Sequence, residues 1–388
     1  VSSTTFATVP LRLHIRGNAS SSPRLRRLSV RSMLGLAKGL GKHTPTVTST
    51  PPPMTSRCGV PLKLEEPPRL RGLLAQKIVR LFFYNCPSVL LELRPLGKAT
   101  ILEFKELGQS GVMAPEIGLC THRYIGGVDP LRQMIEEGAT LIDTAESYGT
   151  ENVVGQAVKG VRQCVIIATK ISTAHLNTAN VTASVDQSLR MLQTDYIDVY
   201  QLHGLNPTIP LAETMGALEE PVDAGKVRFI GVCNFTVAQL KRAQSALTKH
   251  QITTNQVDFS LITRNVDPGL LEYCLENRIT IIAHSPLGRG LLNIRVKDRN
   301  KVLEKLARPT GRSEAQLALN WCISHQGIIA VPKSNSLERM IENCNSSGWG
   351  LSDEQKAMLE NSVSAFRRRG PTELALRRLA RRALQKRP

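Results

Sequence analysis

The segment ATLIDTAESYGTENVVGQAVKGVRQCVIIATK, residues 139–170, holds one full repeat of the pattern that decides the fold. It opens on a short apolar run at 140–144, passes through a stretch with helical spacing at 151–158, and returns to an apolar run at 165–170. Near-continuous apolar strands are what a parallel sheet covered on its outer face requires. Gly160 follows the helical stretch and suits a helix C-cap. The segment therefore predicts a strand–helix–strand unit.

The same alternation recurs along the middle of the chain. Short runs rich in Val, Ile and Leu occupy 117–120, 140–144, 165–170, 196–203, 227–234, 254–259, 280–286 and 327–333. Stretches with the spacing of amphipathic helices occupy 129–137, 151–158, 181–192, 211–224, 237–247, 269–277, 313–324 and 337–344. Eight strands alternating with eight helices over about 240 residues match the size and order of a (β/α)8 barrel. We predict an α/β TIM barrel, preceded by a β-hairpin around Gly108 and Gly111.

A doubly wound open sheet is the competing architecture for such an alternation. That fold is expected to open with a glycine-rich phosphate turn after its first strand. The first predicted strand here ends in CTHRYIGG, residues 120–127, which does not match GxGxxG. The barrel is therefore the better prediction.

The formal net charge of +18 is confined to the two ends of the chain. Residues 1–64 contain ten Lys and Arg with no Asp or Glu, and residues 366–388 contain nine basic residues and one acidic one. The intervening residues 65–365 contain 31 of each sign. A balanced body argues against nucleic-acid binding through the barrel. We expect a barrel domain over 100–366 and a disordered basic tail over 367–388.

The first 95 residues lack sustained periodicity and include the stretch HTPTVTSTPPPMTS, residues 43–56. Such composition cannot build a core, so we expect a largely disordered, low-complexity segment. Its Ser- and Arg-rich, acid-free start resembles an organellar transit peptide, which leaves a cytoplasmic and an organellar location both open. No apolar stretch reaches the ~20 residues that cross a bilayer, so no transmembrane segment is predicted.

Three consecutive predicted strands end in ionisable residues. The second ends in Asp143 and is soon followed by Tyr148, the third ends in Lys170, and the fourth ends in His203. In a barrel, catalytic residues cluster at the carboxyl ends of the strands. We therefore expect these four side chains to converge on one mouth.

The combination suits reduction of a carbonyl group, which needs a hydride donor and a proton donor for the developing alkoxide. Tyr148 is a poor acid, with an ordinary pKa of ~10. A neighbouring ammonium, Lys170, is expected to lower that pKa, and Asp143 to keep the ammonium charged. His203 can polarise the substrate oxygen.

The motifs LIDTAESYG, ATK, DYIDVYQLH and GKVRFIGVCNF together resemble the motif series of the aldo-keto reductase superfamily, in the right order on the barrel strands. The resemblance covers about residues 104–366. It implies an NADPH-dependent oxidoreductase that reduces aldehydes or ketones to alcohols by hydride transfer. It also implies that Tyr148 is the general acid, tuned by Lys170 and Asp143, and that His203 orients the small-molecule carbonyl substrate.

The resemblance further implies a cofactor-binding set for NADP(H). Asn234 and Gln256 match the family's amides at the nicotinamide, and SPLGRG, residues 285–290, matches the loop over the pyrophosphate. The segment VPKSNSLERMIEN, residues 331–343, matches the adenosine end. The full implied set is Thr121, Asn234, Gln256, His284, Ser285, Leu287, Gly288, Lys333, Ser334, Arg339, Glu342 and Asn343.

The adenosine end also has a physical interpretation of its own. Cations, a hydroxyl and a helix N-terminus meet after the eighth strand, where barrels usually bind phosphate. Lys333 and Arg339 favour NADPH over NADH, because two cations suit an extra phosphate.

Several positions depart from the family pattern. Cys120 stands where Gly is usual, Cys233 where Ser is usual, and His284 where an aromatic ring usually stacks on the nicotinamide. Pro221 falls inside a predicted helix, which it should kink or break. These departures keep a second function open: a catalytically weak, cofactor-binding regulatory subunit of the channel-associated type.

The cysteines form no CxxC pair and no Cys/His cluster with zinc spacing, so no metal site is predicted.

Overall fold

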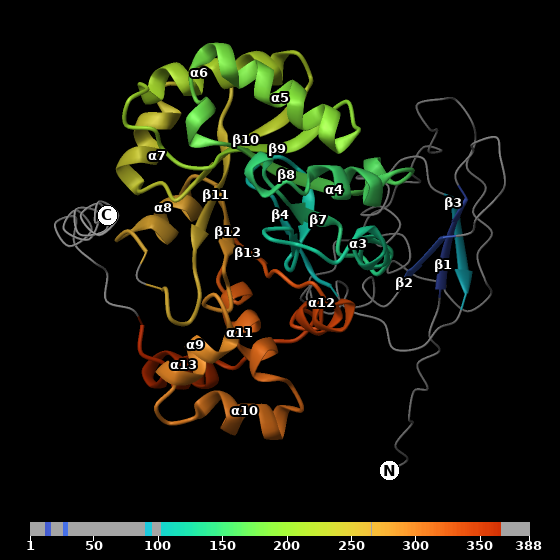
Figure 1. The fold of residues 1–388 in the computed structure, drawn as a ribbon. Coiled ribbons are helices and arrows are strands. Elements are labelled where there is room, and N and C mark those ends of the chain that lie inside the picture. The colour runs from blue at the N-terminus through green and yellow to red at the C-terminus, as the bar shows by residue number, and fades with distance from the viewer. Residues whose placement is uncertain (1–11, 17–25, 30–89, 95–101, 265, 366–388) are drawn as a thin grey trace, which may run out of the picture.

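The computed structural model describes residues 12–16, 26–29, 90–94, 102–264 and 266–365 (Figure 1). Its centre is an eight-stranded sheet in which each strand pairs in parallel with the next along the chain. The strands are β6 (Leu119–Cys120), β7 (Leu141–Asp143), β8 (Ile166–Ile171), β9 (Ile197–Leu202), β10 (Val227–Cys233), β11 (Ile252–Asp258), β12 (Thr280–His284) and β13 (Ile328–Val331). Parallel bridges from Ile117 to Ala330 and from Cys120 to Lys333 join the first strand to the last. The predicted (β/α)8 barrel is confirmed.

Helices cover the outside of this barrel. The eight predicted ones are α3 (Val128–Glu136), α4 (Glu151–Val158), α5 (Thr178–Leu192), α6 (Leu211–Asp223), α7 (Val237–Gln244), α8 (Leu270–Glu276), α11 (Glu314–Ile323) and α12 (Leu337–Cys344). Ser313 caps α11 through a capping box with Gln316. Helix α5 is capped by Asn177, whose side chain accepts from the Asn180 N–H.

Three further helices were not predicted: α9 (Leu291–Lys297), α10 (Val302–Thr310) and α13 (Asp353–Ser362). The segment after the seventh strand contains α9, and α10 follows it. Helix α10 buries Val302, Leu303 and Leu306 and packs beside α13 and α11 (Figure 1).

Pro221 does not interrupt helix α6, contrary to expectation. The helix runs two residues past it, to Asp223, and the Pro221 carbonyl accepts from the Lys226 N–H at 2.9 Å. Proline in the last turn removes a single helical hydrogen bond, and the chain turns there in any case. The structure therefore shows the end of helix α6 shortly after Pro221, and not the expected break within the helix.

The predicted hairpin consists of β4 (Phe104–Glu106) and β5 (Met113–Pro115), paired antiparallel. Leu107, Val112 and Ala114 are buried in one cluster with barrel residues, among them Leu141 and Ile282. Leu141 is the first residue of β7, so the hairpin lies at the amino ends of the strands. It closes that end of the barrel, and the ionisable residues lie at the other end. Apolar packing fills the end that the hairpin closes.

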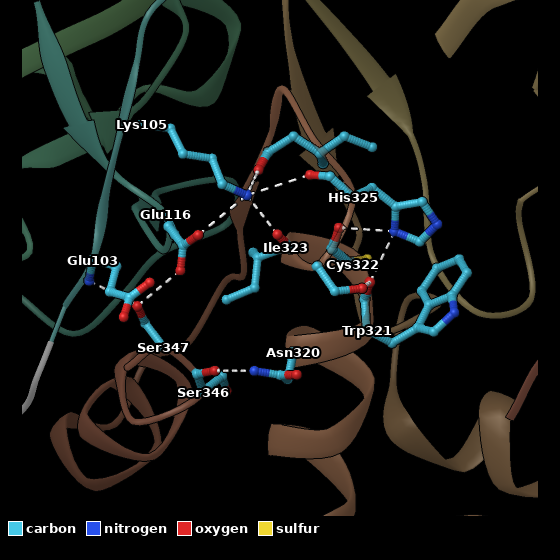
Figure 2. A network of polar contacts seen from close by, with 12 residues as sticks. Glu103, Lys105, Glu116, Asn320, Trp321, Cys322, Ile323, His325, Ser346 and Ser347 are labelled. Atoms are coloured by element: carbon cyan, nitrogen blue, oxygen red, sulfur yellow. Dashed lines mark hydrogen bonds and ion pairs between the residues drawn. The ribbon is translucent and has the colours of Figure 1, made fainter. Parts of the chain in front are cut away.

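A polar network fastens the hairpin to the last part of the barrel, as Figure 2 shows. The Lys105 ammonium donates to the carbonyls of Ile323, His325 (3.3 Å) and Ile328 (2.9 Å). It also pairs with Glu116 Oε1 at 3.1 Å. A largely buried cation with four acceptors is fully satisfied, so the hairpin position is well defined.

On its other side the Glu116 carboxylate continues the network toward the segment after α12 (Figure 2). Glu116 Oε2 accepts from the Ser347 hydroxyl at 2.9 Å, and Ser347 Oγ accepts from the Glu103 N–H at 2.8 Å. The hairpin is therefore joined to two separate segments of the barrel wall.

Three short strands lie within the first 95 residues: β1 (Arg12–Arg16), β2 (Arg26–Ser29) and β3 (Leu90–Arg94). They form an antiparallel sheet in the order β2-β1-β3, which the composition did not predict. The other predictions for this segment and for the tail over 367–388 fall outside the described residues. Within the described part of the chain, no helix is long and apolar enough to cross a membrane.

Candidate active site

The four ionisable residues lie together at the carboxyl ends of the second, third and fourth strands. Asp143 ends β7, Lys170 is the last residue but one of β8, and His203 directly follows β9. Tyr148 ends a short 3-10 helix, η1 (Glu146–Tyr148), in the loop after β7. The barrel thus brings together the set that the sequence predicted.

Lys170 is the centre of this cluster. Its ammonium lies 2.6 Å from Asp143 Oδ1, 2.7 Å from the Thr144 carbonyl oxygen and 4.9 Å from the centroid of the Tyr148 ring. The side chain is completely buried. Burial, the largest single influence, lowers the pKa of Lys170, but Asp143 and the other ionisable groups around it together raise the pKa by more, so the net pKa lies above the ordinary value. Lys170 is therefore charged at neutral pH.

Tyr148 lies beside this ammonium, but its pKa does not fall. Burial raises the pKa of the phenol, Lys170 lowers it and Asp143 raises it again, so that the net pKa lies above the usual one. The sequence-based expectation of a lowered pKa took account of Lys170 alone. With Asp143 2.6 Å from the ammonium, the positive charge is largely neutralised, and burial prevails. Tyr148 therefore holds its proton at neutral pH.

His203 is neutral in this setting. Its ring lies edge-on to the Tyr148 ring, with centroids 5.6 Å apart. Burial, followed by the Lys170 charge, lowers the pKa of His203 to about 4. The Ser147 hydroxyl lies 3.4 Å from Nδ1 of the His203 ring. The second ring nitrogen, Nε2, takes no part in this contact. A neutral imidazole at this position can donate one hydrogen bond to a carbonyl oxygen.

Two contacts of the cluster were not foreseen. The His122 ring meets the Tyr148 ring edge-on at 4.9 Å, and the Gln256 side-chain amide donates to Asp143 Oδ1 at 2.7 Å. His122 lies just past the first strand, so the rule of strand ends could have found it. The second oxygen of Asp143 is buried with no protein partner among the described residues. It can accept a hydrogen bond from a bound group.

The residues predicted to hold the nicotinamide end lie along the fifth to seventh strands. Asn234 is exposed at the end of β10, and its Oδ1 lies 3.3 Å from His284 Nε2. Ser285, at φ 52°, turns the chain after β12, and its carbonyl accepts from the Gly288 N–H at 2.8 Å. At Gly288, φ is +62° and an added Cβ would lie 2.5 Å from the end of the Ile262 side chain, so a larger residue would be strained there. Leu287 is partly buried against the core.

Thr121 is placed differently from the other predicted residues. It is wholly buried, donates through its hydroxyl to the Asp143 carbonyl at 3.1 Å, and accepts from Thr150 Oγ1 at 2.9 Å. Its hydroxyl therefore supports the end of β7. Through this bond to Asp143, Thr121 is linked to the mouth of the barrel.

The residues predicted for the adenosine end surround the start of α12. Ser336 caps that helix by accepting from the Arg339 N–H at 3.3 Å. The side chains of Lys333 and Arg339 are exposed, and neither is in an ion pair with any residue in the described ranges. Two exposed cations beside a helix N-terminus are an arrangement that attracts anions. The rest of this set comprises two buried residues, Ser334 and Asn343, and the partly exposed Glu342.

The two cysteines that depart from the family pattern stand near the Lys170 ammonium. Burial raises the pKa of the Cys120 thiol to about 12 and that of Cys233 to about 12. Both are free and protonated, so they act as small apolar side chains. Nowhere in the described residues do three His, Cys, Asp or Glu side chains gather in a way that could hold a metal ion.

Comparison with known proteins gives a consistent result. A model of the aldo/keto reductase family matches residues 128–363. Aldo-keto reductase YhdN of Bacillus subtilis is 33% identical over 322 residues, covering 68% of this chain and 95% of the relative. Methylglyoxal reductase YeaE of Escherichia coli is 35% identical over 247 residues, covering 61% of this chain and 84% of the relative.

A solved structure agrees with the fold. The crystal structure of an aldo/keto reductase from Klebsiella pneumoniae in complex with NADP and acetate has a TM-score of 0.63 at 33% identity. The match covers 70% of this chain and 98% of that one. With the barrel, the ordered motifs and a family match over more than half of its length, this chain belongs to the aldo/keto reductase family.

Proposed function

We propose that this protein is an NADPH-dependent oxidoreductase that reduces aldehydes or ketones to alcohols, with Tyr148 as the general acid. The observation that carries the proposal is the contact of Lys170 with Asp143, Thr144 and the Tyr148 ring at the carboxyl ends of the strands. The methylglyoxal reductase and the NADP-bound reductase among the similar proteins support the same class of reaction.

The protein's own part in the reaction is to hold one proton and one oxygen in place. Nicotinamide supplies the hydride when it is bound. Tyr148 gives its phenolic proton to the carbonyl oxygen as the alkoxide develops, and the Lys170 charge, 4.9 Å from the ring, stabilises the phenolate left behind. His203 donates from Nε2 to the same oxygen and orients the carbonyl. Asp143 keeps Lys170 charged.

The described residues fit NADPH at both ends. At the nicotinamide end, the unpaired oxygen of Asp143 can accept a hydrogen bond, and the Asn234 amide is exposed. At the adenosine end, Lys333 and Arg339 are free to pair with the 2′-phosphate that distinguishes NADPH from NADH. Imidazole can stack on a nicotinamide, so His284 is compatible with binding.

Turnover separates this function from the alternative of a catalytically weak regulatory subunit. The observation that favours the alternative is that Cys120, Cys233 and His284 stand where the family usually has other residues. The four ionisable residues at the strand ends are nevertheless all present. The test is oxidation of NADPH by the purified protein with a panel of aldehydes and ketones, alongside NADPH binding measured by fluorescence. A kcat of about 1 s⁻¹ or more on at least one carbonyl, within the ordinary range of enzymes, supports the reductase. Tight NADPH binding without reduction of any carbonyl would refute it and favour the regulatory subunit.

A further inference from the structure

Tyr148 stands on a turn that has little internal support. The short helix η1 is closed by the hydrogen bonds from the Tyr148 N–H to the Ala145 carbonyl (3.0 Å) and from the Gly149 N–H to the Glu146 carbonyl (3.4 Å). A single 3-10 turn has poor hydrogen-bond geometry and little stability of its own. The position of the Tyr148 ring must therefore be fixed from outside the turn.

Strand β8 supplies contacts at two points of this turn. At its start, Lys170 Nζ donates to the Thr144 carbonyl at 2.7 Å. In its middle, the N–H of Ser172, one residue past the end of β8, donates to Glu146 Oε1 at 2.9 Å. Lys170 and Ser172 are only two residues apart, so one rigid strand end holds both parts of the turn.

The Glu146 carboxylate has a second partner on the same side. His175 Nδ1, from the 3-10 helix η3 (Thr173–His175), lies 2.9 Å from the same Oε1. The Glu146 side chain is 14% exposed and that of His175 is 49% exposed, so the bond from the Ser172 N–H is the more sheltered of the two. Hydrogen bonds to an ionised acceptor are about twice as strong as neutral ones. One carboxylate oxygen thus ties η1 to both the end of β8 and the loop that follows it.

We propose that Glu146 is a positioning residue for the reaction: by accepting from Ser172 and His175, it fixes η1 and hence the hydroxyl of Tyr148. The inference rests on the proposed role of Tyr148 as the general acid. Misplacement of a reacting group by about 1 Å costs on the order of 100-fold in rate. Loss of the Glu146 contacts should therefore lower turnover while the cofactor residues at the ends of the fifth to eighth strands are unchanged.

The test compares Glu146→Ala and Glu146→Gln with a matched control, Glu213→Ala. Glu213 is also a carboxylate that joins two segments, accepting from the N–H (3.2 Å) and the hydroxyl (3.3 Å) of Thr178, but it does not touch η1. The amide of Glu146→Gln keeps an oxygen that can accept from the Ser172 N–H. We expect kcat to fall roughly 10- to 100-fold in Glu146→Ala, to recover to within about threefold of wild type in Glu146→Gln, and to stay unchanged in Glu213→Ala.

Two further readouts distinguish positioning from general stability. In Glu146→Ala, the solvent deuterium isotope effect on kcat should rise, because proton transfer becomes slower, while the Kd for NADPH stays within about twofold. Amide hydrogen exchange of peptides covering residues 144–150 should be faster than in wild type and in Glu213→Ala. Unchanged kcat in Glu146→Ala, or unchanged exchange at 144–150, would overturn the inference.

The outcome is separable from that of the proposed function. If wild type turns over but Tyr148→Phe is as active as wild type, the general acid is wrong and the positioning inference fails with it. If Tyr148→Phe is inactive and Glu146→Ala is fully active, the general acid stands and only the positioning role of Glu146 is refuted.

Discussion

Lys170 and Asp143 form an ion pair of 2.6 Å whose side chains are 0% and 1% exposed. The two residues come from neighbouring strands, and Asp143 pairs in register with Ala168, two residues before Lys170. This offset lets the ammonium reach both the Asp143 carboxylate and the Thr144 carbonyl that follows it. The pair is therefore a structural bond between β7 and β8 as well as the electrostatic partner of Tyr148.

Replacing Lys170 by Met should damage both stability and catalysis. The substitution leaves the Asp143 carboxylate buried and without its cation, which costs about 3–5 kcal/mol for a buried pair. It also removes the charge beside Tyr148, and we expect kcat to fall at least about 100-fold. Urea unfolding and NADPH oxidation with a reducible carbonyl measure the two effects.

The control is Lys226→Met, which breaks an equally short ion pair on the surface. Lys226 lies 2.6 Å from Asp186, but both side chains are 37% exposed. Exposed pairs contribute about 0–1 kcal/mol. A loss of stability in Lys170→Met no larger than in Lys226→Met would contradict the importance given to the buried pair.

Protonation of His203 should destabilise the folded protein only in acid. The folded-state pKa is lowered to about 4 by burial and Lys170, below the ordinary value of 6.5. As the pH falls from about 6.5 to about 4, the unfolded chain binds this proton before the folded one does, so stability is lost over that window. We expect the loss of unfolding free energy between about pH 7.5 and about pH 5 to be smaller in His203→Gln than in wild type. An equal loss in both proteins would show that His203 is not held neutral.

Lys333 and Arg339 should determine the choice of cofactor. Charge-assisted hydrogen bonds contribute about 1.5–3 kcal/mol each, so Lys333→Met or Arg339→Met should raise the KM for NADPH roughly 10- to 100-fold. The KM for NADH should be unchanged, because NADH lacks the 2′-phosphate. Lys356→Met, which alters a lysine on α13 paired with Asp353, is the control. Equal effects on NADPH and NADH would exclude a role in phosphate recognition.

Lys105 should be important for stability and unimportant for cofactor binding. Its ammonium is shared among three carbonyls and Glu116 at the closed end of the barrel (Figure 2). Lys105→Met leaves these acceptors and the Glu116 charge without a partner, which should cost roughly 2–4 kcal/mol. Thermal unfolding and NADPH titration provide the measurements. A change in NADPH affinity comparable to the change in stability would mean that the hairpin and the mouth of the barrel are coupled.

The sequence was sufficient to predict the barrel and the grouping of four residues, for one physical reason. In a parallel barrel the strand ends share one rim, so Asp143, Lys170 and His203 could be placed together once their strands were recognised. The buried apolar runs that mark those strands are strong signals. At most of the strand ends, the observed bound differs from the predicted one by one or two residues.

What the sequence could not predict depends on contacts between segments. The net rise in the pKa of Tyr148 results from burial and from the 2.6 Å distance between Asp143 and Lys170, neither of which is a property of spacing. The contacts of Glu146 with Ser172 and His175 depend on how two loops meet. Helix α10 buries Val302, Leu303 and Leu306 by packing against α11 and α13.

The proposed reaction depends most directly on the proton of Tyr148. The decisive measurement is kcat for NADPH oxidation by wild type and Tyr148→Phe on the best carbonyl of the panel, with NADPH affinity determined for both. Because phenylalanine fills the same space without the hydroxyl, we predict that kcat falls at least about 100-fold, toward the roughly 10²–10⁴-fold contribution of general acid catalysis, while the Kd for NADPH changes less than about threefold. Full activity in Tyr148→Phe would contradict the assignment of Tyr148 as the general acid.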